Sequence, residues 1–148
     1  MSKELCYALA FSSGLLIAIQ AGVNSQLRMA MQHPVLAALI SFLTGSVLLA
    51  IVYIFSAKSV VPASSITSVG WWKMTGGLLG AIYIFTIIIV APKIGAANTL
   101  CFAIAGQLVS AIILDHFGLI GFPLKEITLS RIAGVILTIV GVYLVQKK

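Results

Sequence analysis

The chain has 148 residues, of which 61% are hydrophobic and 8% are charged, and its mean hydropathy is +1.17. A soluble domain of this size carries about 25% charged residues, so the composition excludes an ordinary water-soluble globule and a disordered segment. The net charge of +6 does not indicate a nucleic-acid partner, because the basic residues are scattered singly and form no patch that could follow a phosphate backbone.

Five apolar runs follow one another along the chain, and each is close to the length of about 20 residues that a membrane-spanning helix needs. They cover approximately residues 5–27, 34–57, 71–91, 95–114 and 129–145. Five such spans use about two thirds of the chain, which leaves no room for an extramembrane domain. The sequence therefore predicts an all-α integral membrane protein with one transmembrane domain over residues 1–148.

The breaks between the runs contain the residue types that end helices. Residues 32–34 (Gln-His-Pro) separate the first two runs, and proline is well tolerated at the first position of a helix. Residues 91–95 (Ala-Pro-Lys-Ile-Gly) predict a second tight connection. Residues 60–70 predict a short exposed loop, and residues 116–130 form the longest connection. We also expect the first run to be retained and not cleaved, because no small-residue cleavage site follows it.

With five spans the two termini lie on opposite sides of the membrane, and the basic residues divide almost evenly between those sides. The N-terminal side holds Lys3, Lys58, Lys73, Lys125 and Arg131. The other side holds Arg28, Lys93, Lys147 and Lys148. For such a distribution the positive-inside rule predicts no clear orientation in the membrane. Either a weak bias still fixes one topology, or copies insert in both orientations and pair as an antiparallel dimer of ten helices.

A second consideration favours the inverted pair. Five helices are few for a mid-membrane substrate site with two alternating gates, and many transporters use two inverted repeats for this purpose. A half-sized chain can reach the same arrangement by pairing with an inverted copy of itself, or with a paralogous half. The expected partners are therefore the lipid bilayer, a second copy as an antiparallel homodimer, and a small-molecule substrate, but no nucleic acid.

The spans contain no carboxylate at mid-membrane. Glu4 lies at one end of the chain, Glu126 lies in the last connection, and Asp115 lies at the end of the fourth run. Because charged groups at bilayer depth mark ion and proton pathways, their absence argues against a proton-coupled cation exchanger that works through a central Glu.

Neutral polar residues lie inside the first and fourth runs instead. Gln20 and Asn24, with Arg28 at the edge, share one face of the first helix at helical spacing, and Gln107 and Ser110 lie in the fourth. These side chains either join helices by hydrogen bonds or line a polar cavity for a substrate. Arg28 either extends to the membrane interface or binds an anionic group.

Asp115 and His116 follow the fourth apolar run directly. They either cap the helix end and bond to the long connection, or form a gate or a proton-linked site. The second option is open because histidine is the side chain that changes charge near neutral pH.

Small residues predict where helices pack closely. Gly76 and Gly80 form a GxxxG pair in the third run, and Gly134 and Gly141 share a face of the fifth. Small residues let backbones approach one another in a membrane, so we expect helix contacts at these positions and a dimer contact on the fifth helix.

The chain contains no recognisable enzyme motif. It has no Gly-rich phosphate loop, no metal-ligand spacing of His, Cys and carboxylates, and no patterned nucleophile with a base. We therefore expect no enzyme activity, no cofactor and no metal.

Several motifs resemble those of a known family. Residues 20–28 (QAGVNSQLR) resemble the first-helix signature of the YdcZ-like family of small bacterial inner-membrane proteins, within the drug/metabolite transporter superfamily. Similar blocks follow in order at residues 34–45, 76–83, 92–97, 105–107, 114–119 and 131–142. The resemblance implies a multi-pass protein of the bacterial inner (plasma) membrane.

The resemblance also implies kinship with the small multidrug resistance exporters, four-helix chains that work as antiparallel dimers around a first-helix Glu. Here Gln20 and Asn24 stand in the first helix without an acid, which argues against proton-coupled export of lipophilic cations. We expect a secondary transporter that moves a small polar or amphipathic metabolite by alternating access at a dimer interface. A dual-topology channel and a non-transporting partner subunit are the alternatives.

Overall fold

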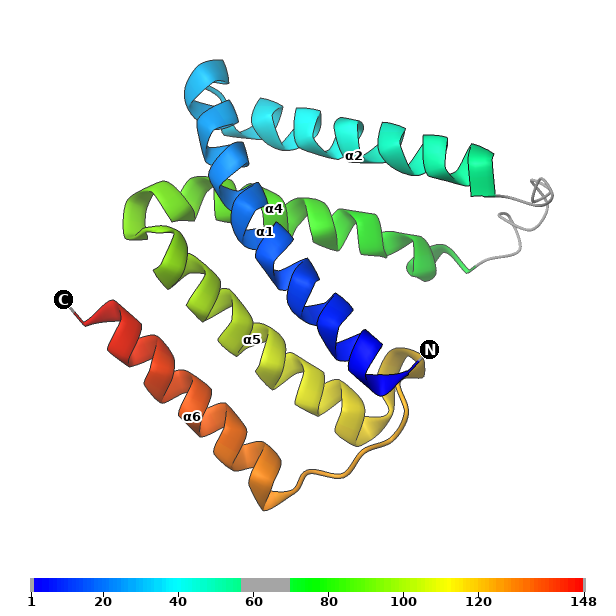
Figure 1. Ribbon diagram of the computed structural model, residues 1–148, viewed down its shortest axis with the longest axis vertical. Coiled ribbons are helices and arrows are strands. Elements are labelled where there is room, and N and C mark those ends of the chain that lie inside the picture. The colour runs from blue at the N-terminus through cyan, green and yellow to red at the C-terminus, as the bar shows by residue number, and fades with distance from the viewer. Residues whose placement is uncertain (1, 57–69, 148) are drawn as a thin grey trace. The chain divides into compact units, whose positions relative to one another are not determined.

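The computed structural model describes residues 2–56 and 70–147, and its regular structure there is helical. Within these ranges five helices are long and apolar enough to cross a membrane, as the sequence predicts. The elements are α1 (Lys3–Met31), α2 (Pro34–Ser56), the short 3-10 helix η1 (Trp71–Thr75), α4 (Gly76–Ile94), α5 (Ala96–Phe117), the 3-10 turn η2 (Leu119–Gly121) and α6 (Leu129–Gln146) (Figure 1). Of the predicted loop at residues 60–70, all but Gly70 lies outside the described residues.

The first connection forms where the sequence predicts it. α1 ends at Met31, and Gln32 takes a left-handed conformation with φ 54° and ψ 18°. α2 then begins at Pro34. The Leu36 N–H donates to Nδ1 of His33 at 3.2 Å, so His33 satisfies one of the amides that a helix start leaves without a partner. The turn is therefore closed by side-chain capping as well as by proline.

The second connection is shorter than predicted. α4 continues through Pro92 to Ile94, and only Gly95 separates it from α5. Gly95 has φ 86° and ψ 153°, a region that is essentially restricted to glycine. Pro92 does not end the helix because its ring is compatible with helical φ, although it removes one backbone donor.

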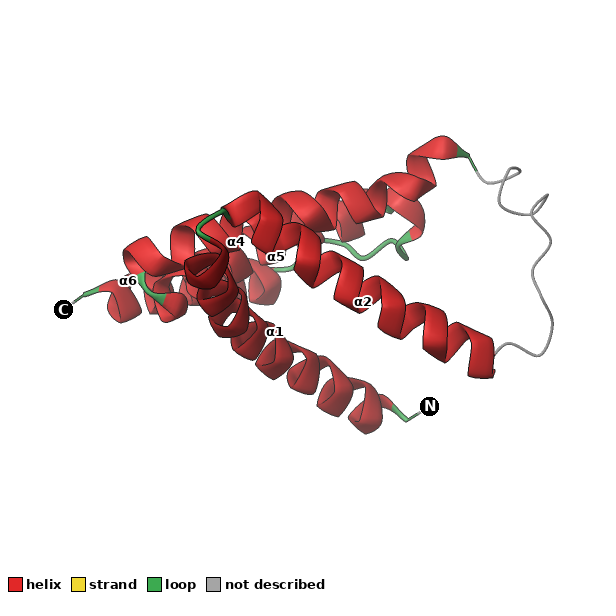
Figure 2. Ribbon diagram, turned by 90° about the horizontal axis from the view of Figure 1, so that it is seen from above, coloured by secondary structure: helices red, strands yellow, loops and turns green. Residues whose placement is uncertain are grey.

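The chain forms two compact units, Met1–Pro92 and Lys93–Lys148, and each is described by itself. In the first unit, α2 and α4 pack together through Ala37, Ala38 and Ile88, which are buried, with Phe85 packed against them. Figure 2 shows the two helices diverging from this end. Leu27 of α1 packs against the same cluster, so side chains of three helices meet there.

In the second unit α5 packs along α6. α5 ends at Phe117, and Gly118 takes a left-handed conformation at φ 60° that lets its N–H donate to the Asp115 carbonyl at 3.3 Å. Apolar side chains of the two helices, including Ile112 and Val135, line a groove between them.

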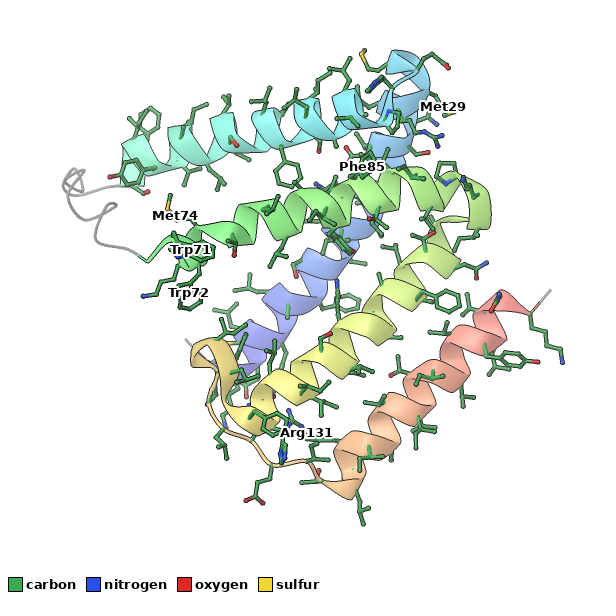
Figure 3. The ribbon with its side chains drawn as sticks, turned by 180° about the vertical axis from the view of Figure 1, so that it is seen from behind. Met29, Trp71, Trp72, Met74, Phe85 and Arg131 are labelled. Atoms are coloured by element: carbon green, nitrogen blue, oxygen red, sulfur yellow. The ribbon has the colours of Figure 1, made fainter. Side chains whose placement is uncertain are left out.

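Large apolar side chains are exposed on every long helix. Phe55 and Leu129 are each 86% exposed, and Trp71 and Trp72 project at the start of η1 (Figure 3). A soluble protein rarely exposes apolar surface of this extent, whereas a bilayer covers it, and indoles favour the headgroup region at the ends of spans.

Candidate transport site

The predicted polar face of α1 is built by three side chains one turn apart, at positions 20, 24 and 28. Gln20 is exposed, Asn24 is only 3% exposed and Arg28 is half-buried. The Asn24 amide has no hydrogen bond to any residue in the described part of the chain. The amide is not among the fully buried polar groups that lack a partner in the described residues. Asn24 therefore keeps unused hydrogen-bonding capacity at the small part of its surface that stays exposed.

Arg28 is joined to α4 by a hydrogen bond that follows from the position of a proline. In a helix the N–H of residue 92 would donate to the carbonyl of residue 88, but Pro92 has no N–H. The Ile88 carbonyl therefore lacks this donor, and the Ile88 residue is only 1% exposed. Nη1 of Arg28 donates to this carbonyl at 3.4 Å. Arg28 therefore covers a carbonyl that Pro92 leaves without a helical donor.

An apolar groove lies beside this contact in the first unit. It has a volume of about 430 Å³ and is lined by Val35, Ala38, Leu39 and Phe42 of α2 and by Ala81, Ile82 and Phe85 of α4. Ala38 and Phe85 belong to the same packed cluster as Ile88. The groove therefore approaches the helix turn whose carbonyl binds Arg28.

The two predicted polar residues of α5 lie in the second unit. Gln107 and Ser110 are both exposed, and neither side chain bonds to another described residue. Each is therefore available to a ligand or to a second chain.

Asp115 forms an ion pair that ties α5 to α6. Its Oδ2 accepts from Nη2 of Arg131, whose Nη1 donates to the Lys125 carbonyl at 3.1 Å. The Lys125 N–H in turn donates to the Asp115 carbonyl at 2.8 Å. Figure 3 shows Arg131 at the start of α6 beside the end of α5. This closed ring of bonds is the geometry expected if Asp115 anchors the long connection.

His116 lies in the last turn of α5, next to Asp115, but takes no part in that ring of bonds. Its Nδ1 is buried and has no hydrogen-bond partner in the described ranges. Its imidazole meets the Phe117 ring edge-on, with centroids 4.8 Å apart. The predicted gating or proton-linked role of His116 stays a prediction.

The four glycines predicted at helix contacts have different surroundings. A methyl group added at Gly80 would lie 3.6 Å from the Phe42 ring of α2, so Gly80 is in a real helix contact. A methyl group at Gly76, Gly134 or Gly141 would meet no described atom within 4 Å. Those three positions are open in the single chain.

Sequence reasoning missed two features of these sites. Arg131 was counted only as a charge at a helix end, although it is the partner of Asp115. The Ile88 carbonyl was not considered at all, because its apolar side chain gives no sign of a polar role. A signal was present, since a proline inside a helix frees the carbonyl four residues earlier.

Comparison with known proteins agrees with the conclusion that the five long apolar helices span a membrane. The chain is a multi-pass inner-membrane protein. A family model described as "Putative inner membrane exporter, YdcZ" matches residues 5–144, and the chain belongs to this family. It is 29% identical over 148 residues to the Inner membrane protein YdcZ of Escherichia coli (strain K12), with 100% of this chain and 99% of that protein covered. No solved structure matches the chain. The family description denotes membrane transport and not catalysis.

The bond between Arg28 and Ile88 predicts a coupling between positions 28 and 92. Arg28→Met should lower the free energy of unfolding by about 1–3 kcal/mol, because it leaves a buried carbonyl unsatisfied. In a Pro92→Ala background the restored N–H can serve that carbonyl, so the same change at Arg28 should cost much less. Reversible unfolding in mixed micelles measures both costs, and equal costs in the two backgrounds would contradict the interpretation.

The ion pair at the end of α5 predicts a second coupling. Asp115→Asn and Arg131→Met should each destabilise the protein, and their double-mutant cycle should give a coupling energy of about 1 kcal/mol, modest because both side chains are partly exposed. Glu126→Gln is the control, since this acid of the same connection has no ion pair in the described residues. It should change stability by less than about 0.5 kcal/mol, and additive effects of Asp115→Asn and Arg131→Met would contradict the pair.

Proposed function

We propose that the protein is a secondary transporter that moves a small polar or amphipathic metabolite by alternating access at the interface of an antiparallel homodimer. Gln20, Asn24 and Arg28 of α1, with Gln107 and Ser110 of α5, would bind the substrate. Membership in a family described as inner membrane exporters supports the transport function.

The observation that carries the proposal is the Asn24 amide, which makes no hydrogen bond in the described residues although the residue as a whole is only 3% exposed. If this amide served only to join two helices, it would be expected to bond to a neighbouring helix, as polar side chains in membranes generally do. Polar groups at membrane depth that have no such partner mark substrate pathways. A substrate could supply the hydrogen bonds that this amide does not make within the described part of the chain.

Gating is assigned to the end of α5. The ring of bonds around Asp115 and Arg131 holds α5 and α6 together at one end, and the unpaired Nδ1 of His116 lies next to it. Opening at this end would require the ion pair between Asp115 and Arg131 to break. This arrangement is suited to a gate or a proton-linked step.

The antiparallel pair is supported by the distribution of charge. Every described basic residue lies in a terminal turn of a helix or outside the helices, so each belongs to one side of the membrane. The numbers of Lys and Arg residues on the two sides are nearly equal, so the positive-inside rule favours neither orientation strongly. Gly134 and Gly141 of α6, which have no close neighbour in the single chain, provide a surface on which a second copy could pack closely.

A transport assay with a conservative variant tests the substrate role of α1. Purified protein in liposomes should show saturable uptake from a panel of labelled amino acids, organic acids and organic cations. Asn24→Ala should abolish most of that flux without loss of stability, because it removes an amide that makes no bond. Gln26→Ala, on another face of α1, should leave flux unchanged. Steady single-channel currents in place of saturable flux would contradict a carrier.

Reporter fusions test the inverted pair. A reporter active only in the cytoplasm and another active only in the periplasm, each fused to the C-terminus, should both give signal in separate cultures. Adding two lysines after Lys147 should shift the balance towards one orientation, because short-loop Lys and Arg set topology. Activity of only one reporter would disprove dual insertion.

A further inference from the structure

We propose that the transported solute is an amphipathic organic anion, whose negative group binds Arg28 and whose apolar part lies in the groove between α2 and α4. This proposal rests on the proposed function, because it names the chemical class that the α1 site accepts.

Arg28 is a half-buried cation without a carboxylate partner among residues 2–56 and 70–147. The three acids of the chain are Glu4, Asp115 and Glu126. The one ion pair in the described ranges joins Asp115 to Arg131. A guanidinium has five N–H donors, and Arg28 makes a single hydrogen bond, to a neutral carbonyl at a long 3.4 Å.

An anion would compete well for this guanidinium. Hydrogen bonds from a cation to an anionic oxygen are shorter and roughly twice as strong as bonds between neutral groups. A carboxylate or sulfonate would therefore displace the Ile88 carbonyl from Arg28. Because Pro92 supplies no replacement donor, the end of α4 would lose one of its links to α1 when the anion binds. Substrate binding and the freedom of α4 are coupled in this way.

The groove suits the apolar part of the same ligand. Its seven lining residues are all apolar, and its volume of about 430 Å³ lies within the range of about 300–1,000 Å³ found for small-molecule sites. Phe85 lines the groove and lies three residues before Ile88, so the groove ends close to one helical turn from the carbonyl that Arg28 binds. An apolar groove with a cation near its end is complementary to a ligand that has an apolar part and one negative charge.

An anionic lipid has the same two chemical parts, but Asn24 favours a solute. Asn24 lies one turn from Arg28 toward the middle of α1; the residue is 3% exposed, and its amide makes no hydrogen bond within the described ranges. A headgroup held at the end of the helix would leave the Asn24 amide unsatisfied. A solute with a polar group near its anion could bond to both residues.

The test uses the full chain in phosphatidylcholine nanodiscs and two probes of opposite charge. Labelled 1-octanesulfonate is permanently anionic, and octyltrimethylammonium is its cationic counterpart. We expect saturable binding of octanesulfonate, at least about tenfold weaker in Arg28→Met, and no saturable binding of the cation. Lys93→Met removes an exposed positive charge from the end of α4 and should leave binding unchanged. Equal binding of both probes, or full binding by Arg28→Met, would overturn the proposal.

A second variant separates binding from folding. The double variant Arg28→Met, Pro92→Ala restores a donor to the Ile88 carbonyl and should fold well, yet it should still fail to bind octanesulfonate. Arg28→Lys should retain part of the affinity, since it keeps the charge but not the planar fork. Recovery of binding in the double variant would show that Arg28 acts only through structure, and the proposal would be wrong.

The role of the groove is tested with two alkylsulfonate probes whose alkyl chains differ in length. Ala81→Leu narrows the groove and should weaken octanesulfonate binding while leaving the weaker binding of ethanesulfonate unchanged. Equal loss for both probes, or loss for neither, would exclude the groove as the place of the apolar part.

The remaining outcomes distinguish this proposal from the proposed function. Saturable uptake of other solutes by liposomes, with no binding of octanesulfonate, would overturn the anion class and leave the transporter intact. Arg28-dependent binding without flux of any solute would overturn transport. Displacement of octanesulfonate by phosphatidylglycerol, again without flux, would assign Arg28 to a lipid headgroup and overturn the solute.

Discussion

The first unit depends on one backbone carbonyl that has lost its usual donor. Inside a bilayer no water is present to satisfy a free polar group, so helices must bond internally or find side-chain partners. Pro92 removes the donor that would serve the Ile88 carbonyl, and Arg28 reaches from α1 to replace it. The bond joins two helices that are far apart in sequence. It also draws a positive charge to the edge of the Ala37, Ala38 and Ile88 cluster, and the candidate site is built around that charge.

The second unit solves a similar problem with a different pairing. Charged side chains lie at the end of α5 and at the start of α6, on either side of a connection that has backbone groups to satisfy. The Asp115 carboxylate and carbonyl, the Arg131 guanidinium and the Lys125 peptide satisfy one another in a closed set of bonds. The pairing neutralises the acid that lies nearest to a span. Of the chain's two half-buried arginines, Arg131 therefore has an anionic partner and Arg28 has a neutral one. This difference is the reason why the proposed anion site is placed at Arg28.

Much of the architecture could be predicted from the pattern of apolar residues. The five spans, the turn at Gln32 and the start of α2 at Pro34 all follow from local signals, because a helix in a bilayer satisfies its own backbone and needs little from its neighbours. The predicted connection at residues 91–95 is too long, because only Gly95 separates α4 from α5. Proline there is compatible with the last helical turn, and only Gly95 takes a conformation that a helix cannot contain.

The sequence by itself determined the class of protein, the spans, the absence of a mid-membrane acid and the polar spacing of Gln20, Asn24 and Arg28 on one helix face. These are properties of composition and of helical periodicity, which act within a single segment. Only the tertiary structure decided which of these residues is buried and what each one contacts. The packing of separate helices decides whether Asn24 has a partner and which carbonyl Arg28 binds. It also decides whether Asp115 pairs with His116 or with Arg131. Contacts of that kind join positions up to 60 residues apart, and no local pattern encodes them.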